Sequence, residues 1–285
     1  MDLTITLESA CDLDKRLIDK YDLKIIDMNY MIGDNEFSTA SHDIFQSQIY
    51  DSMKKGERVL TSQINEEEYE TFFEQNIQGN KPILHIGFSS GLSGTIDNAK
   101  AAAEIINKKH GRRLVYVVDT LCGSCGQGML AMFVREFALC ADTLQEVLNF
   151  VDDVKLKINH CYTLDDLKYQ VMGGRIKPAV ALIGKLLNIK PVMRLDDNGK
   201  LALVSKVFSR KKAIISLAER CNKCIDCDYK IIIIAHANCE GDANLLSEQI
   251  NKNISIKPII LNLGPIIGGH SGPGTLSIYY VGDKR

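Results

Sequence analysis

The 285-residue sequence has no tryptophan, only six prolines and no run of the ~20 apolar residues that a membrane-spanning helix needs. It also lacks an excess of charge of either sign, because 34 basic and 36 acidic side chains leave a formal net charge of −2. This balance gives no reason to expect a nucleic acid or a membrane surface as the partner. Residues 1–15 lack the basic start and apolar stretch of a signal peptide, so we expect a cytoplasmic protein.

The nine cysteines are an odd number, which fits the reduced thiols of a reducing compartment. Two groups have the spacing of a metal or redox site: Cys122 with Cys125, and Cys221 with Cys224 and Cys227. The pair lies in a Gly-rich turn with no second Cys/His pair close by in sequence, and the trio has no adjacent fourth ligand. We therefore predict no metal and no cofactor, with a metal or redox role for the trio as an alternative.

Strand-like and helix-like patterns alternate along the first half of the chain, which is typical of a parallel sheet covered by helices. The length allows two cores of ordinary size. We predict an α/β fold of two lobes. Residues 1–155 form an N-terminal lobe with a mostly parallel sheet, and residues 156–275 form a C-terminal lobe that is a mixed α/β sandwich. Residues 276–285 fit either lobe.

The individual elements follow from periodicity and turn residues. Asn198 and Gly199 are typical of a hairpin turn. Groups of small polar residues follow the strands of the first half, and in open α/β sheets ligands bind at that end. The expected strands are 4–7, 24–30, 83–88, 114–118, 191–195, 201–208, 230–235, 258–261 and 276–281, and the expected helices are 12–21, a segment after residue 63, 95–107, 129–140, 164–172, 178–187, 210–221 and one near residue 245.

The turn at 89–95 is rich in serine and glycine and lies between a predicted strand and a predicted helix. A helix beginning near Ser93 presents unpaired backbone N–H groups, which attract an anion. Gly94 lets the backbone approach a ligand closely, and the Ser93 hydroxyl can donate a hydrogen bond. Thr61 and Ser62 precede another helix in the same way. Two such turns together would hold a carboxylate, whereas the alternative is that Ser62 and Ser93 are only N-caps.

The same turn contains an enzyme-like pattern, because residues 87–91 read Gly-Phe-Ser-Ser-Gly and match the G-x-S-x-G nucleophile turn. Ser89 would be the nucleophile, and His236 or His270 would be the later histidine. The turn is longer than a sharp nucleophile turn requires, and no HGGG-type oxyanion segment precedes it. A serine hydrolase that uses Ser89 is the alternative function.

A second Gly-rich segment, 264–274, is predicted to be a loop. His270 in this loop is available as a hydrogen-bond donor to an anion, or is simply an exposed loop residue. Arg175 follows Gly173 and Gly174 at the end of a predicted helix, where a cation also favours the helix dipole.

Together these segments resemble the DegV family of bacterial fatty-acid-binding proteins. The matching motifs occur in order from one end of the chain to the other: ESACDL at 8–13, TSQ at 61–63, SSGLSGT at 89–95, VD at 118–119, GGRI at 173–176, LLNIKP at 186–191 and GGHSGPG at 268–274.

The resemblance implies one long-chain fatty acid buried between two lobes. It implies that Thr61 and Ser93 hydrogen-bond the carboxylate, with His270 in the head-group network. Members of the FakB type are not themselves the catalyst but present the acid to a separate fatty acid kinase, and Arg175 matches a position associated with kinase contact. Since each buried methylene contributes about 0.8 kcal/mol, such a ligand needs an enclosed apolar tunnel.

Two segments depart from the family pattern. Residues 7–9 read Leu-Glu-Ser where the family usually has Thr-Asp-Ser, so the acid at Glu8 is one methylene longer. Residues 120–122 read Thr-Leu-Cys where a serine-rich stretch is usual. We expect these changes to alter the shape of the pocket rather than the class of ligand.

Overall fold

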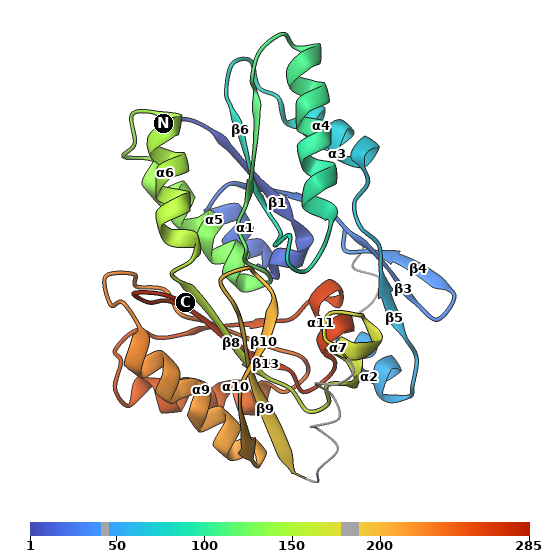
Figure 1. Cartoon of the computed structure of the whole chain (residues 1–285), viewed down its shortest axis with the longest axis vertical. Helices are drawn as coiled ribbons and strands as arrows, with labels where there is room; N and C mark the ends of the chain where they lie inside the picture. The colour runs from blue at the N-terminus through green and yellow to red at the C-terminus, as the bar shows by residue number, and fades with distance from the viewer. Residues whose placement is uncertain (41–45, 178–187) are drawn as a thin grey trace.

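The computed structural model describes residues 1–40, 46–177 and 188–285, which form an α/β molecule with three sheets (Figure 1). The first sheet is parallel throughout and has the order β2-β1-β6-β7, with β1 at Thr4–Glu8, β2 at Leu23–Ile26, β6 at Ile83–Gly87 and β7 at Val115–Asp119. The second is a mixed sheet of order β10-β9-β8-β13-β11-β12, with β8 at Ile158–Thr163, β9 at Ile189–Leu195, β10 at Leu201–Phe208, β11 at Ile233–His236, β12 at Ile259–Asn262 and β13 at Leu276–Val281. The third is a small antiparallel sheet of β4 (Asn35–Ser38), β3 (Asn29–Ile32) and β5 (Val59–Thr61).

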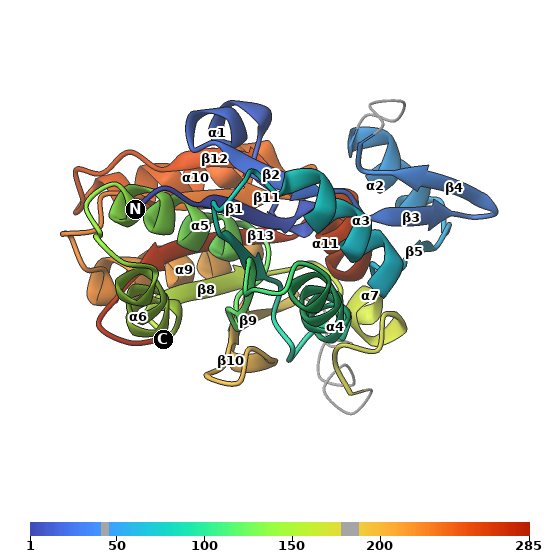
Figure 2. The same ribbon diagram turned by 90° about the horizontal axis from the view of Figure 1, so that it is seen from above.

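Helices connect and cover these strands, as Figures 1 and 2 show from two directions. Among the described residues they are the 3-10 helix η1 (Ser9–Cys11), α1 (Lys15–Lys20), α2 (Gln46–Lys54), α3 (Glu66–Asn76), α4 (Thr95–Lys109), α5 (Cys125–Ala138), α6 (Leu144–Lys155), α7 (Lys168–Met172), α9 (Arg210–Cys224), α10 (Glu240–Asn251) and α11 (Pro265–Ser271). None of the described helices is both long and apolar enough to cross a bilayer.

Helix α5 lies between the parallel sheet and the mixed sheet and contacts strands of both. Its first ten residues, 125–134, are all buried, which explains why its sequence is apolar on every side. Strands β11 and β13 also have two buried faces. Ile233 and Tyr279 belong to the apolar cluster that contains α5, whereas Ile234 and Ile278 belong to the cluster that contains α9 and α10. Successive side chains of a strand point to opposite faces of the sheet, so neighbouring residues pack into different clusters.

The predicted fold class is confirmed, with a parallel sheet in the first part of the chain and a mixed sheet in the second. Strand β13 pairs with β8 and β11, so residues 276–281 belong to the mixed sheet. We propose a lobe boundary near residue 155, because the described strands of the parallel sheet all precede it and those of the mixed sheet all follow it.

Several expected elements differ in the structure. The strand expected at 24–30 is two strands, because the chain leaves the parallel sheet after Ile26 and enters a hairpin with β4 that turns at Gly33, where φ is +57°. The helix expected at 12–21 starts only at Lys15, after the N-cap Asp14. The segment expected as a loop at 264–274 contains α11. Helix α6 and strand β8 were not predicted, and the helix expected at 178–187 lies outside the described residues.

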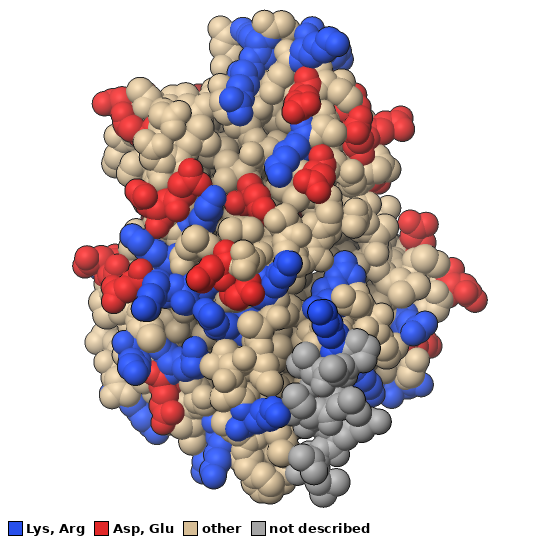
Figure 3. Space-filling view, in the orientation of Figure 1, with Lys and Arg blue, Asp and Glu red and all other residues tan. Residues whose placement is uncertain are grey.

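The surface carries both signs of charge. Figure 3 shows basic and acidic side chains interspersed over one face, including the junction between the upper and lower halves. This distribution agrees with the formal net charge of −2 and differs from the single-sign surface that a polyanion would attract.

Candidate ligand-binding cavity

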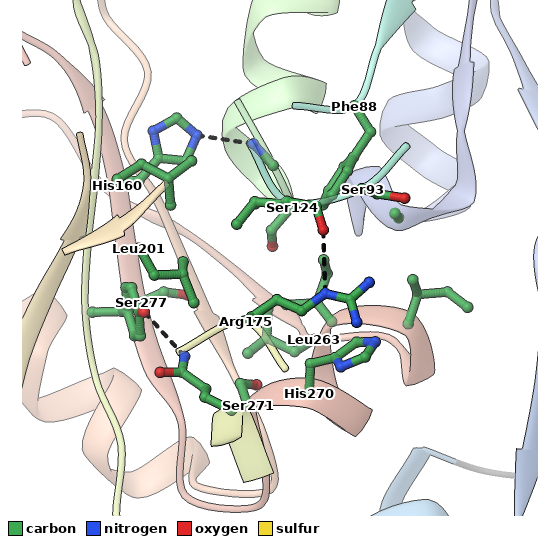
Figure 4. A pocket seen from close by; sticks show the side chains of 18 of the residues that line it. Phe88, Ser93, Ser124, His160, Arg175, Leu201, Leu263, His270, Ser271 and Ser277 are labelled. Atoms are coloured by element: carbon green, nitrogen blue, oxygen red, sulfur yellow. Dashed lines mark hydrogen bonds between the residues drawn. The ribbon is translucent and has the colours of Figure 1, made fainter. Parts of the chain in front are cut away.

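A cavity lies between the carboxyl end of the parallel sheet and the mixed sheet (Figure 4). Residues from several elements line it: the turn after β6, the start of α5, strands β8 and β13, and helices α7 and α11. Much of the wall is apolar, which suits a ligand with a long apolar part. These apolar residues are Ala10, Met28, Phe88, Leu92, Leu195, Leu201, Leu263, Ile266 and Ile267.

Four polar residues, which we call the mouth cluster, line the more exposed end of this cavity: Thr61, Ser93, Arg175 and His270. The Thr61 Oγ1 and His270 Nε2 atoms are 2.8 Å apart, within hydrogen-bond distance. Arg175 donates from Nε to the Leu92 carbonyl oxygen at 3.2 Å. Figure 4 shows the Arg175 guanidinium between Ser93 and His270. The structure therefore brings together four residues that are far apart in the sequence.

The charge at the mouth cluster is positive and comes from Arg175. Among the described residues, Arg175 is the only lysine or arginine that lines the cavity, and no aspartate or glutamate lines it. An anionic group at this end therefore meets a guanidinium, which is well suited to a carboxylate, without a competing acidic side chain.

His270 is a neutral side chain at pH 7. Burial, together with the smaller effect of the nearby Arg175 charge, lowers the pKa of its imidazole to about 4. A neutral imidazole carries one N–H group. The ring lies so close to Gly173 that a Cβ atom added there would be 2.3 Å from Nδ1, so the glycine makes room for the ring. The sequence indicated Gly173 only as a helix end.

Ser93 lies just before helix α4, which begins at Thr95 with Gly94 as its N-cap. The Ser93 hydroxyl oxygen accepts a hydrogen bond from the Thr95 backbone N–H at 3.3 Å, and its own proton has no acceptor among the described residues. The Ser93 side chain therefore accepts a hydrogen bond from the first turn of the helix and can still donate its own proton to a ligand. Gly94 is not among the lining residues, and a Cβ atom there would contact the Gln63 side chain at 3.4 Å.

Ser62 lines the cavity but does not cap helix α3. The N-cap is Asn65, whose side chain accepts from the Glu68 N–H while the Glu68 carboxylate accepts from the Asn65 N–H. The Ser62 hydroxyl instead donates to the Asn29 carbonyl oxygen at 3.3 Å. The interpretation of Ser62 as an N-cap is therefore wrong.

A buried carboxylate supports the turn that carries Ser93. Glu8 is fully buried and accepts hydrogen bonds from the Tyr69 hydroxyl at 2.8 Å, the Gln127 side-chain amide at 2.5 Å and the Phe88 backbone N–H at 3.1 Å. His85 Nε2 is 3.2 Å from the same carboxylate. Because Phe88 begins the turn after β6, Glu8 fixes where that turn leaves the sheet.

The surroundings of Glu8 favour its ionised form. Burial is the largest single influence and raises the pKa, but His85 and the hydrogen bonds from His85 and Tyr69 together lower it below its ordinary value. We call Glu8, Tyr69, His85 and Gln127 the Glu8 cluster; none of the four lines the cavity. Sequence reasoning noted Glu8 only as a departure from a family pattern, although one acid in the otherwise uncharged strand TITLE was a signal of a buried role.

Ser89 has a structural contact instead of a nucleophile's surroundings. Its buried hydroxyl donates to the Gly199 carbonyl oxygen at 2.9 Å and accepts from the Gly91 N–H at 3.2 Å. No described histidine hydrogen-bonds it, and it does not line the cavity. Ser89 thus joins the β9–β10 hairpin to the turn after β6, and this geometry gives no support to the hydrolase interpretation.

The cysteines with metal or redox spacing differ in their surroundings in the described part of the chain. Burial raises the pKa of Cys122 to about 11 and that of Cys125 well above its ordinary value, so both are thiols at pH 7. Cys221 is buried in the apolar cluster of the mixed sheet, whereas Cys224 and Cys227 are exposed. Among the described residues, no three His, Cys, Asp or Glu side chains group as metal ligands.

The fold and the cavity define an α/β protein with a parallel sheet, a mixed sheet and a largely apolar cavity, whose more exposed end carries hydroxyl groups and one guanidinium. The model of an uncharacterised protein family, the DegV family, matches residues 2–283, and this chain belongs to the DegV family. A DegV domain-containing protein of Clostridium perfringens is 31% identical over 284 residues, which are 99% of this chain and 98% of the relative.

Solved structures share the fold over nearly the whole chain. A Thermotoga maritima protein described as revealing a fatty acid binding function is 26% identical, with a TM-score of 0.84 and 99% of both chains covered. A DegV protein of Ruminococcus gnavus with vaccenic acid has a TM-score of 0.86 and covers 97% of this chain and 99% of its own. At 19% identity, the second comparison shows the fold alone.

Proposed function

We propose that this protein binds one long-chain fatty acid in the cavity and acts as a carrier rather than as an enzyme. The observation that carries the proposal is the division of the cavity wall, which is apolar over much of its area and has Arg175 as its one described Lys or Arg, at the more exposed end. A fatty acid has the same division between chain and head group. The likeness to the fatty-acid-binding Thermotoga protein supports the ligand class.

In this proposal Ser93 and Thr61 donate their hydroxyl protons to the carboxylate. Ser93 already accepts from the Thr95 N–H, so its proton is available. We assign to neutral His270 the tautomer with its proton on Nε2, which donates to Thr61 Oγ1 and leaves the Thr61 proton available as well. Arg175 supplies the positive charge that compensates the carboxylate.

The apolar wall supplies the affinity. Removing a methylene from water contributes about 0.8 kcal/mol, so a chain of ~16 carbons gains roughly 12 kcal/mol before the costs of binding are subtracted. Hydrogen bonds at the mouth cluster then set the direction in which the acid enters, because a buried carboxylate without partners is strongly unfavourable.

The finer part of the proposal is that a separate fatty acid kinase receives the head group. Arg175 is exposed even though it lines the cavity, so a partner that covers the mouth cluster can touch it. The carrier keeps the acyl chain enclosed while the kinase acts on the carboxylate.

Lipid extraction from the purified protein, followed by mass spectrometry, tests the ligand. We expect close to one long-chain fatty acid per chain, or uptake of one equivalent when delipidated protein is titrated with oleic acid. Protein that contains no acid and takes up none contradicts the proposed function.

The kinase step is tested separately with Arg175→Gln, a bacterial fatty acid kinase and ATP at saturating fatty acid. Saturation removes any effect of weaker binding, so a loss of acyl phosphate of at least tenfold reports a contribution of Arg175 to the kinase step beyond ligand affinity. Arg16→Gln, on an exposed part of α1, is the matched control and should keep the wild-type rate. Equal rates for wild type and Arg175→Gln contradict the kinase contact.

A further inference from the structure

A second polar group, more deeply buried than the mouth cluster, lies in the wall of the same cavity. It consists of Tyr162 on β8, Gln170 on α7 and Ser271 at the end of α11, and we call it the inner polar group. All three are more than nine-tenths buried, at 8%, 3% and 6% exposure. Figure 4 shows Ser271 on the other side of Arg175 and His270 from Ser93.

The inner polar group has hydrogen-bonding capacity that the described protein does not use. Gln170 donates from Nε2 to the Tyr162 hydroxyl oxygen at 3.0 Å, but its carbonyl oxygen Oε1 has no partner among the described residues. The Ser271 hydroxyl has no described partner either. The Tyr162 hydroxyl proton has no described acceptor, and burial raises the pKa of Tyr162, so the group stays a donor.

Two other buried polar residues of the wall have partners within the protein. Ser277 also lines the cavity and is buried, but its hydroxyl donates to the Ala235 carbonyl oxygen at 3.0 Å. Thr275 likewise donates to backbone carbonyl oxygens. Buried polar atoms are normally paired, so unpaired atoms on two elements of one cavity indicate a ligand or water that pairs with them.

The chemistry of the unpaired atoms selects the ligand group. Gln170 Oε1 can only accept a hydrogen bond, the Tyr162 proton can only be donated, and the Ser271 hydroxyl can do either. A hydroxyl group both donates and accepts, whereas a methylene does neither. An oxygen-bearing acyl chain therefore pairs with atoms that a plain acyl chain leaves unpaired.

We propose that the inner polar group recognises a hydroxyl on the acyl chain, so that the preferred ligand is a hydroxylated long-chain fatty acid. This inference rests on the proposed fatty-acid-binding function and deepens it. The carboxylate is held at the mouth cluster, and the chain hydroxyl pairs with Gln170 Oε1 and with Tyr162 or Ser271.

Binding of octadecanoic acid and a series of its monohydroxy isomers to delipidated protein tests the proposal. We expect at least one isomer to bind about tenfold more tightly than the plain acid, as one or two net hydrogen bonds predict. Equal binding of the plain acid and every isomer overturns the inference but leaves the proposed function intact. If neither kind of acid binds, the proposed function fails as well.

Variants test whether Gln170 and Ser271 cause the preference for the hydroxylated acid. Gln170→Met combined with Ser271→Ala should remove it and leave the plain acid bound at least as tightly as in the wild type. Gln145→Met makes the same amide-to-thioether change at an exposed position of α6 and should keep the wild-type preference. A preference that survives in the double variant overturns the assignment to these residues.

A measurement on the wild type alone avoids any effect of substitution on folding. Cells that produce the protein are fed equal amounts of octadecanoic acid and the best isomer, and the acids that copurify are compared with the free pool. We expect the hydroxylated acid to be enriched about tenfold on the protein, and equal proportions overturn the inference.

Discussion

Two polar clusters lie near the carboxyl end of the parallel sheet, and they differ in how many of their hydrogen bonds the protein itself supplies. The Glu8 cluster is fully buried, its carboxylate accepts from three different residues and contacts a fourth, and it lies outside the cavity wall. The mouth cluster is less buried, lines the cavity and leaves the Ser93 proton without a described acceptor. The hydrogen bonds to Glu8 hold the turn in place; Gln127 Oε1 has no described partner, but it lies outside the cavity wall. Unpaired polar groups that line the cavity are the ones that indicate where a ligand binds.

The comparison predicts that the largest effect on stability comes from the Glu8 cluster. Glu8→Ala removes the carboxylate to which Tyr69, Gln127 and the Phe88 N–H donate, and the buried Phe88 N–H loses its acceptor. We expect a loss of about 3–5 kcal/mol in the free energy of unfolding, as for other broken buried charge networks. Chemical denaturation followed by circular dichroism measures it.

Glu104→Ala, on the exposed face of α4, is the matched control and should change the free energy of unfolding by less than about 0.5 kcal/mol. If Glu8→Ala is no more destabilising than this control, the Glu8 cluster does not hold the turn.

The second-largest expected effect is on the pH dependence of the free energy of unfolding, and it comes from His270 in the mouth cluster. His270 has a pKa of about 4 in the folded protein against an ordinary value near 6.5, because burial and Arg175 disfavour its protonation. The folded state binds this proton less readily than the unfolded state, so the associated stability is present above pH 6.5 and is lost as pH falls toward 4. The loss is up to about 3 kcal/mol.

The difference between wild type and His270→Gln isolates this effect from those of other titrating groups. Denaturation between pH 7 and pH 4 should give a steeper fall for the wild type than for the variant. Parallel curves mean that His270 is not held neutral by its surroundings.

The smallest expected effect is a loss of fatty-acid affinity with little change in stability. Ser93→Ala removes one hydrogen bond to the proposed carboxylate, and hydrogen bonds to charged groups contribute about 1.5–3 kcal/mol, so the fatty acid should bind roughly 10- to 100-fold more weakly. Stability should hardly change, because the Ser93 hydroxyl makes only one weak contact at 3.3 Å. Isothermal titration calorimetry with oleic acid measures the affinity.

Ser90→Ala is the control for this variant, since Ser90 lies on the same turn but is exposed and does not line the cavity. Its affinity should equal that of the wild type. Equal weakening in both variants assigns the effect to the turn as a whole instead of to Ser93.

The sequence predicted the fold class because its signals are local. Alternating strands and helices, the Asn-Gly hairpin turn and the apolar run at 276–281 each lie within a few residues, and β13 has the predicted bounds. The prediction of a loop at 264–274 was wrong for α11, because it relied on the high glycine content and glycine disfavours helices. There the glycines allow close packing: a Cβ atom at Gly268 would lie 2.2 Å from the Tyr50 hydroxyl, and one at Gly269 would lie 2.6 Å from Val59.

Motifs in the sequence point to Thr61, Ser93, Arg175 and His270, and all four line one cavity. Their part in ligand binding stays a prediction. The Glu8 cluster and the inner polar group depend on partners more than 60 residues apart or on buried atoms left unpaired, and no local pattern in the sequence reveals either property.

The central claim is that the mouth cluster binds a carboxylate. Comparing the affinities of oleic acid and oleyl alcohol tests it most directly, because the two share the chain and differ in the charge of the head group. We predict that the acid binds at least tenfold more tightly than the alcohol and that Ser93→Ala narrows the difference. Equal affinity of the wild type for the acid and the alcohol would contradict the account.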